Sequence, residues 1–194
     1  MVAKEVQRVQ IERRAELRSW LKKHHAQNEG IWLVSFKKAV PKKHVPHEAI
    51  IEEALCFGWI DSVPRSLDDE RWMIRLSPRK RGSAWSKANR ARAEALIRAG
   101  RMTAAGREKI EAAKADGSWD FLVDVQRNVV PPDLAAALEA HPPARDRFDA
   151  FPPSSKRIIL EWIKQAKKPE TRAKRVLETA LKAAKNIRAN HYRQ

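Results

Sequence analysis

The segments that favour β-structure are confined to the first 77 residues of this chain, and this limits the folds open to it. Ile31–Phe36 is short, apolar and rich in β-formers, which predicts a buried strand. Trp59–Ser66 and Arg71–Ser77 predict two more strands, joined by a turn at Leu67–Glu70. In Arg71–Ser77 apolar and basic residues alternate, so one face of that strand should be apolar and the other partly basic.

Helices are predicted around and after these strands. Residues 11–27 and His47–Phe57 have an apolar face at helical spacing, and Gly58 ends the second of them. We expect a helix over residues 84–99, capped by Ser83, and another that begins after Thr103 and ends near residue 117. The two meet at a short turn, which suits either a helix-turn-helix or a plain helical hairpin.

The C-terminal part is predicted to be entirely helical. Four helices are expected at about 133–140, 144–150, 155–167 and 170–188, with Pro132, Pro143 and Pro169 at helix starts. The fold class is therefore α+β: a small antiparallel sheet of about three strands packed with helices, then an all-helical module. We place the domains at residues 1–125 and 130–194.

Composition narrows the setting of the protein. Apolar residues make up 43% of the 194, enough for a core, but no apolar run approaches the roughly 18–20 residues of a membrane span. The N-terminus is charged and does not resemble a secretory signal. The single cysteine, Cys56, cannot form an internal disulfide. We therefore expect a soluble, cytoplasmic protein without membrane insertion.

Positive charge is concentrated in two stretches. The formal net charge is +16, and residues 75–107 hold ten basic residues and one acid, while 164–193 hold ten basic residues and two acids. Such a field favours nucleic acid or phosphorylated ligands. The alternative is that the basic residues only keep a helical protein soluble.

Several blocks of residues carry a resemblance to a known family. They are Glu53–Ser62, Ser77–Lys80 with Ser83–Arg90, Gly100–Gly106, Gly117–Trp119 and Ala166–Arg172. In this order they resemble the YdeI/OmpD-associated, or bacteriocin-protection, family over nearly the whole chain from Glu12 to Leu181. The resemblance implies a bacterial cytoplasmic protein linked to envelope stress or bacteriocin tolerance. It implies no catalytic residues.

Two pieces between Gly58 and Gly106 are candidates for the functional site. The first is the corner that begins at Gly58, where Asp61 and Arg65 on one strand face would form an ion pair, with Arg75 on the neighbouring strand. In the functional interpretation the arginines bind an anion and Asp61 orients them. In the structural one Asp61 caps a turn and the arginines are solvated.

The second piece is the basic loop Ser77–Gly82, which leads into a helix. Free backbone N–H groups and the helix dipole favour anions there, and an arginine can hold a phosphate with two bonds. Alternatively, Ser83 only caps the helix. The residues that we assign to anion binding in this piece are Arg79, Lys80, Ser83, Ser86, Lys87, Asn89 and Arg90.

Aromatic residues and catalytic patterns complete the prediction. Trp59, Trp72 and Trp85 are expected to pack between elements or to line an aromatic pocket, and Trp85 shares a helix face with Asn89. The six histidines lack metal-ligand spacing, Cys56 lies on an apolar helix face, and no Ser/His/Asp order is evident. We therefore assign no catalytic residue, no metal and no cofactor.

These observations favour a binding protein over an enzyme. The leading hypothesis is a protein that binds a phosphorylated small molecule or nucleic acid through the basic residues of the α+β part. A second hypothesis is an adaptor that docks on a protein through Trp59, Trp72, Trp85 and the basic C-terminal helix. A third is an enzyme on a small acidic substrate, with Asp61 as acid or base. The sequence does not predict the oligomeric state.

Overall fold

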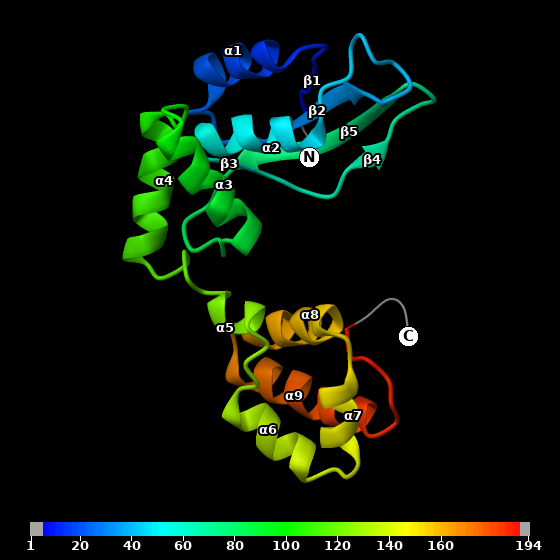
Figure 1. The fold of residues 1–194 in the computed structure, drawn as a ribbon. Helices are drawn as coiled ribbons and strands as arrows, with labels where there is room; N and C mark the ends of the chain where they lie inside the picture. The colour runs from blue at the N-terminus through cyan, green and yellow to red at the C-terminus, as the bar shows by residue number, and fades with distance from the viewer. Residues whose placement is uncertain (1–5, 191–194) are drawn as a thin grey trace, which may run out of the picture. The chain divides into compact units, whose positions relative to one another are not determined.

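A computed structural model describes residues 6–190 of the chain. The chain divides into two compact units between Phe121 and Leu122, compared with the predicted boundary at residues 125–130 (Figure 1). Over the described residues, the first unit contains a sheet and four helices, and the second contains five helices. The α+β class predicted from the sequence is confirmed. The two units are described separately below.

The sheet has five strands, and it is mixed. They are β1 (Arg8–Gln10), β2 (Ile31–Phe36), β3 (Trp59–Asp61), β4 (Arg65–Ser66) and β5 (Arg71–Pro78). The order is β1-β2-β5-β3, and β4 also pairs with β5. β1 runs parallel to β2, while β5 is antiparallel to β2, β3 and β4.

The strands predicted from the sequence do pair antiparallel, but the predicted number of about three was too low, and the additional β1 makes the sheet mixed. β1 was missed because its sequence, Arg8-Val9-Gln10, is short and polar. The predicted strand Trp59–Ser66 is two strands, since it is interrupted before Pro64, which has no N–H to donate to a ladder.

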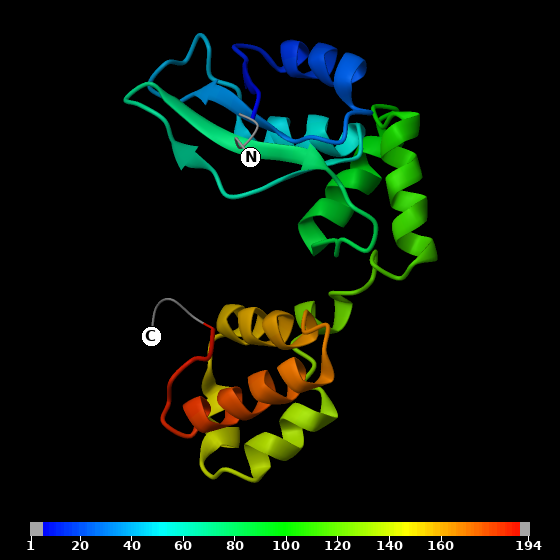
Figure 2. The ribbon, with the colours of Figure 1, turned by 180° about the vertical axis from the view of Figure 1, so that it is seen from behind.

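Register gives the sheet two different faces. Leu33, Ile74 and Leu76 are fully buried and share the face that Trp59 also occupies. Helices α1 (Arg14–His24) and α2 (His47–Cys56) pack on this face: the ring of Trp20, from α1, meets Trp59 edge-on at 5.8 Å. Figure 2 shows the sheet from its other side, with β5 in front of α2.

Helices α3 (Lys87–Arg98) and α4 (Ala104–Ala115) pack against α2. Thr103 caps α4 as predicted, because its hydroxyl oxygen accepts a hydrogen bond from the N–H of Gly106. The cap of α3 is Ser86, whose hydroxyl accepts from the N–H of Asn89, and not Ser83 as predicted. The helix begins three residues later than predicted because residues 79–85 form a loop against the end of the sheet.

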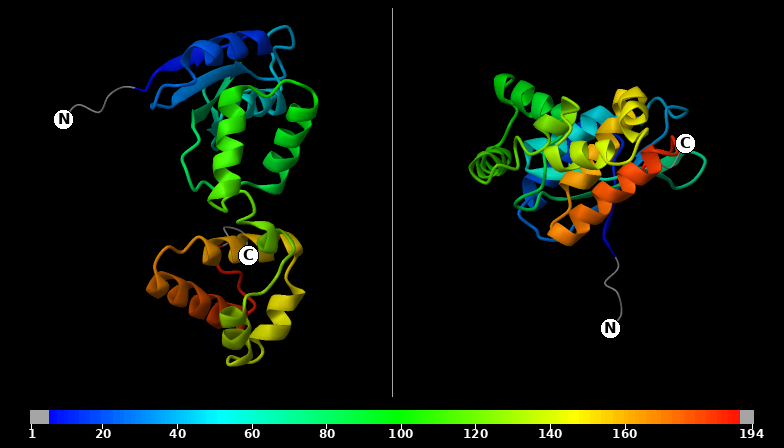
Figure 3. Two further views of the ribbon diagram at one scale, coloured as in Figure 1. Left: turned by 90° about the vertical axis from the view of Figure 1, so that its left-hand side faces the viewer. Right: turned by 90° about the horizontal axis from the view of Figure 1, so that it is seen from below.

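The second unit is helical throughout its described residues. Its helices are α5 (Val123–Gln126), α6 (Pro132–Glu139), α7 (Ala144–Ala150), α8 (Pro153–Lys164) and α9 (Pro169–Ala183). α9 packs against α6, α7 and α8 (Figure 3), and Leu138, Phe148 and Ile159 are buried at their centre. Four of these helices match the predicted ones, and α5 is an additional single turn. Over the described residues, every helix is too short or too polar to cross a membrane.

Candidate anion-binding site

The site forms around the side chain of Arg79, directly after β5. The Arg79 N–H donates to the carbonyl of Gly58 at 2.9 Å, which fixes the end of the sheet against the turn after α2. The side chain is only 3% exposed, and its guanidinium lies 3.9 Å from the centroid of the Trp85 ring. Nη1 donates to the carbonyls of Ser83 and Ala84, at 3.2 and 3.1 Å. The basic loop therefore wraps around an arginine that belongs to the core.

Several donor atoms around Arg79 are buried without an acceptor. Nε and Nη2 of Arg79 and the indole Nε1 of Trp85 have no hydrogen-bond partner within residues 6–190. Ser118 is also buried beside them, and its side chain lies close enough to Asp116 to lower the pKa of that carboxyl. All three residues line one cavity of about 220 Å³. Because buried donors normally have partners, and lacking one costs roughly 1–3 kcal/mol each, this cavity is suited to a group rich in acceptors.

The walls of the cavity carry more positive than negative charge. Lys80, Arg81 and Lys109 line it together with Arg79, against Glu108 and Asp116. Asp116 is already engaged, because it accepts from the N–H groups of Gly82 and Ser118 at 3.1 and 3.0 Å. Bonds from Ser118 and then from Gly82, together with the charge of Arg81, lower the pKa of Asp116.

Burial changes the acidity of Arg79 without removing its charge. Desolvation lowers the pKa of its guanidinium to about 10, and the negative charge of Asp61 opposes that shift. The group stays protonated at neutral pH. Its cation is weakly solvated, so a bound anion would meet little competition from water.

The predicted residues of the basic loop divide between the cavity and the helix. Arg79, Lys80, Ser83 and Trp85 line the cavity. Ser86, Lys87, Asn89 and Arg90 do not line it, because they form the cap and first turn of α3. The Ser86 hydroxyl is engaged by the N–H of Asn89, and Arg90 bonds Asp120 at 2.6 Å.

The predicted ion pair between Asp61 and Arg65 is absent. Asp61 is opposite Leu76 and lies on the face that the helices cover, whereas Arg65 is opposite Met73 on the other face. The register shifts by one residue between β3 and β4, and one residue is enough to move a side chain across a sheet. Arg75 shares the face of Arg65. Asp61 Oδ2 instead lies 3.7 Å from His47 Nε2.

The three tryptophans named from the sequence are mostly internal. Trp59 and Trp85 are buried, and Trp72 is half-buried with its indole N–H donating to the Phe36 carbonyl at 3.2 Å. They serve packing, as one of the two interpretations expected. An adaptor surface built from all three is not formed.

Sequence reasoning missed the residues that complete the cavity from further along the chain. Lys109 and Asp116 approach the loop only through the fold, about thirty residues downstream. The one available pointer was the block Gly117–Trp119, which supplies Ser118 and places the Trp119 ring 4.8 Å from the Trp85 ring at a tilt of 49°. A second cavity, of about 740 Å³, was also missed; it is lined by residues that include Lys37, Lys38, His44, His47, Arg65 and Trp72.

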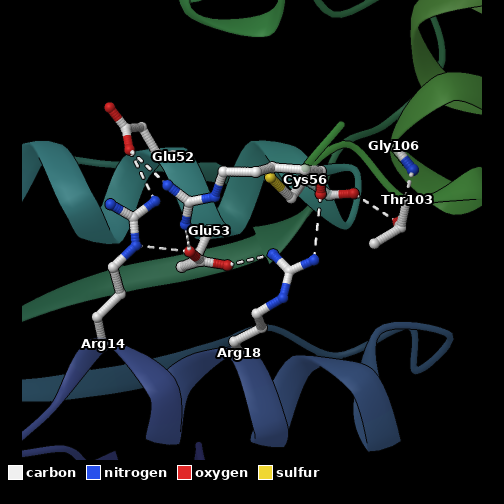
Figure 4. A network of polar contacts seen from close by, with 8 residues as sticks. Arg14, Arg18, Glu52, Glu53, Cys56, Thr103 and Gly106 are labelled. Atoms are coloured by element: carbon white, nitrogen blue, oxygen red, sulfur yellow. Dashed lines mark hydrogen bonds and ion pairs between the residues drawn. The ribbon is translucent and has the colours of Figure 1, made fainter. Parts of the chain in front are cut away.

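A third feature is a group of arginines that is already neutralised. Glu53 is fully buried on α2 and accepts from Arg14 at 2.6 Å, from Arg18 at 2.8 Å and from Arg101 (Figure 4). Arg14 also pairs with Glu52 at 2.7 Å. These contacts join α1, α2 and the turn before α4. Because the guanidiniums bond within the protein, the network is a structural element of the fold.

Fold and cavity together define a protein of two units, one α+β unit with a small basic cavity and one helical unit. Residues 9–109, just over half of the chain, match the family described as "Domain of unknown function (DUF8412)", and the chain belongs to this family. Residues 128–186 match the family described as "Bacteriocin-protection, YdeI or OmpD-Associated". The second match confirms the predicted resemblance over residues 128–186, and not over nearly the whole chain, because all of the blocks between Glu53 and Gly106 lie inside the first match. No curated protein and no solved structure matches the chain.

Proposed function

We propose that the α+β unit binds a phosphate-bearing ligand and that the phosphate occupies the cavity beside Arg79. The observation that supports this is a set of buried donors without acceptors in the described residues, Nε and Nη2 of Arg79 and Nε1 of Trp85, in two residues that line the cavity. A phosphate presents several charged oxygens, and a guanidinium can bond two of them at once.

The size and charge of the cavity support a phosphate group in particular. At about 220 Å³ it is smaller than the roughly 300–1,000 Å³ of pockets that enclose a whole small molecule. It would hold the anionic end of a ligand whose remainder lies outside. Lys80, Arg81 and Lys109 add three cations, which suits a doubly charged group better than a single carboxylate.

The test is direct binding of inorganic phosphate and of a phosphate monoester, measured by calorimetry at 50 mM salt. Trp85→Phe removes one N–H donor and keeps the apolar ring, while Arg79→Lys keeps the charge and removes the two free guanidinium donors. Hydrogen bonds to charged groups contribute about 1.5–3 kcal/mol, so Arg79→Lys should weaken binding roughly 10- to 100-fold.

Arg98→Ala is the matched control, since it removes an exposed cation of α3 that does not line the cavity. If Arg98→Ala weakened binding while Arg79→Lys, which keeps its charge, bound phosphate as well as the unaltered protein, only overall charge would matter. Absence of phosphate binding by the unaltered protein would refute the proposal.

We also propose a cellular role and a compartment for this binding activity. The description of the family matched by residues 128–186 supports a part in bacteriocin protection, and the composition supports a cytoplasmic setting. Deleting the gene in its host and exposing the cells to bacteriocins would test it, with unchanged sensitivity as the contrary outcome.

One observation favours a second function, catalysis on a small acidic substrate. Asp61 lies 3.7 Å from His47, and His47 lines the 740 Å³ cavity together with Lys37, Lys38 and Arg65. An acid beside a histidine at a basic cavity can orient the imidazole as a general base. A panel of phosphate mono- and diesters should then be hydrolysed by the protein and not by His47→Gln or Asp61→Asn. No turnover of any ester would remove this candidate.

A further inference from the structure

The face of the sheet opposite α1 and α2 carries a row of three residues from neighbouring strands. In the register of the sheet, Arg8 of β1 lies beside Trp32 of β2, and Trp32 lies beside Arg75 of β5. Arg65 of β4 shares this face, and its guanidinium carbon lies 5.3 Å from the centroid of the Trp32 ring. The Arg65 guanidinium thus lies beside the Trp32 ring, and Arg8 and Arg75 occupy the neighbouring positions on the same face of the sheet. We call Arg8, Trp32, Arg65 and Arg75 the Trp32 face.

The arginines of the Trp32 face have no carboxylate partner. Neither Arg8, Arg65 nor Arg75 makes an ion pair or a side-chain hydrogen bond with any residue in the range 6–190, apart from the ring contact of Arg65. Arg71, further along β5, differs because it pairs with Asp68 at 2.7 Å and bonds Gln10 at 2.9 Å. The charge of the Trp32 face is therefore available to an external anion.

A cavity of about 500 Å³ extends this face at its end. It is lined by residues that include Gln7, Gly30, Arg75, Ser77 and Lys80. Gly30 lies against β5: a Cβ there would be 2.6 Å from the carbonyl oxygen of Leu76 and 3.2 Å from Nε of Arg75. The missing side chain therefore lets Arg75 lie close to the backbone beside the cavity. The volume falls in the range of pockets that hold small molecules or single nucleotides.

We propose that the Trp32 face binds single-stranded nucleic acid, with a base stacked on Trp32 and phosphates at Arg8, Arg75 and Lys80. This goes beyond the proposed function, because it uses a different surface of the same unit, and of the residues named for the two sites only Lys80 is common to both. An aromatic ring between cations is the combination that binds single strands without sequence preference. The ring needs an unstacked base, which a duplex does not offer, and an acidic peptide would use the cations and leave the ring unused.

In this arrangement Arg65 adapts to the ligand. Its guanidinium now covers the Trp32 ring, and on binding it would lie on the far side of the base or bond the adjoining phosphate. Either position keeps its charge near the strand. Arg65 comes from β4, a two-residue exposed strand, so it can move without disturbing the core.

The experiment measures binding of a labelled oligothymidine of about 15 nucleotides by fluorescence anisotropy, across a salt series. Loss of base stacking in Trp32→Leu should weaken binding about 5- to 100-fold. Trp32→Tyr retains a stacking ring and should bind within a few fold of the unaltered protein. The double variant Arg8→Gln/Arg75→Gln removes two phosphate contacts and should reduce the slope of log affinity against log salt by about 1.4.

The matched control is Lys22→Gln/Lys23→Gln, which removes the same charge from exposed positions on α1. It should leave the salt slope within about 0.3 of its starting value, because long-range charge alone changes the slope little. Thermal unfolding of every variant checks that the fold persists. Since Trp32→Tyr keeps the ring, the proposal stays testable even if Trp32→Leu fails to fold.

Three results would overturn the proposal. The first is no binding of oligothymidine at 50 mM salt. The second is that a DNA duplex or polyglutamate binds as tightly as oligothymidine. The third is that the control and Arg8→Gln/Arg75→Gln reduce the salt slope equally. Phosphate binding in the Arg79 cavity is a separate measurement. Trp32→Leu should leave it unchanged, and Arg79→Lys should leave oligothymidine binding unchanged, so that either proposal can fail alone.

Discussion

Two groups of arginines in the α+β unit make opposite use of the same side chain. Arg14, Arg18 and Arg101 converge on Glu53, which is fully buried, whereas Arg8, Arg65 and Arg75 lie on the face of Trp32 and form no ion pair with a carboxylate of residues 6–190. The first group holds helices together, and the second leaves its charge open to solvent. Arginine content alone therefore does not locate a ligand site; the position of the nearest carboxylates does.

The difference has a physical basis in burial. A buried carboxylate is costly unless several donors satisfy it, and Glu53 has three. Arg18 is further held by a bond to the carbonyl of Arg101 at 3.1 Å and by contact with the Phe57 ring. A ligand would have to break these bonds to use the first group. Within residues 6–190 the arginines of the Trp32 face have no ion pair of this kind, although Glu29 also lines the cavity that Arg75 and Lys80 line.

Neutralising Glu53, on which Arg14, Arg18 and Arg101 converge, should cause the largest loss in the free energy of unfolding. Glu53→Gln leaves three guanidiniums facing a neutral group, and breaking a buried charge pair costs about 3–5 kcal/mol. We expect the free energy of unfolding, measured with urea, to fall by that amount. Glu52→Gln is the control, since Glu52 is 31% exposed and should cost about 1 kcal/mol or less. Equal losses in the two variants would contradict a special role for Glu53.

A substitution in the turn that carries Arg101 should cause the next largest loss in the free energy of unfolding. Thr103 caps α4 and its hydroxyl also donates to the carbonyl of Cys56 at 2.5 Å (Figure 4). Thr103→Ala should lower the free energy of unfolding by about 1–2 kcal/mol, because both contacts are lost. Thr103→Ser keeps the hydroxyl and should recover most of the loss. If it does not, the methyl group of Thr103 matters more than its hydrogen bonds.

The thiol beside the first group gives a kinetic test. Burial, followed by the charge of Glu53, raises the pKa of Cys56. The reactive thiolate therefore forms only above the usual pH range of a cysteine. At pH 8 the native protein should react with a thiol reagent at least about tenfold more slowly than the urea-unfolded chain. Comparable rates would show that Cys56 is accessible in the folded state.

Removing the exposed ion pair between Arg172 and Asp133 in the second unit should have the smallest effect on stability. A bond from Arg172 at 2.7 Å lowers the pKa of Asp133, so the folded value lies below the unfolded one of about 4. The pair thus stabilises the fold fully above pH 4, and this contribution disappears as the pH falls through the folded pKa. Asp133 is 44% exposed, so less than about 1 kcal/mol is expected. The stability difference from Asp133→Asn should shrink steadily as the pH falls below about 4; a difference that does not change with pH would exclude the ion pair as its cause.

Much of the fold followed from local sequence, and the misses have physical causes. The alternation in Arg71–Ser77 correctly predicted one apolar and one partly basic face. The sequence also indicated the cap at Thr103 and the Pro-started helices of the second unit. The strand β1 was missed because its pairing with β2, and not its own residues, makes it a strand.

The sites were less predictable than the fold. Arg79 was singled out for a charge expected to be exposed, but the fold buries it under Trp85. Trp32 and Arg8 were not singled out, because only the register of the sheet places them beside Arg75. Glu53 stood in a recognisable block, yet nothing local showed that arginines from positions 14, 18 and 101 would meet it.

The length of the connection between Asp61 and Arg65 determines which face of the sheet the Arg65 side chain occupies. Asp61 is opposite Leu76 and Arg65 is opposite Met73, so the connection of residues 62–64 sends the chain to the other face of the sheet. Removing or adding one residue there would reverse the parity and turn Arg65 toward the helices. Relatives with an odd number of residues between these two strands, as here, should place the arginine on the face of the tryptophan. Relatives with an even number should place it on the opposite face.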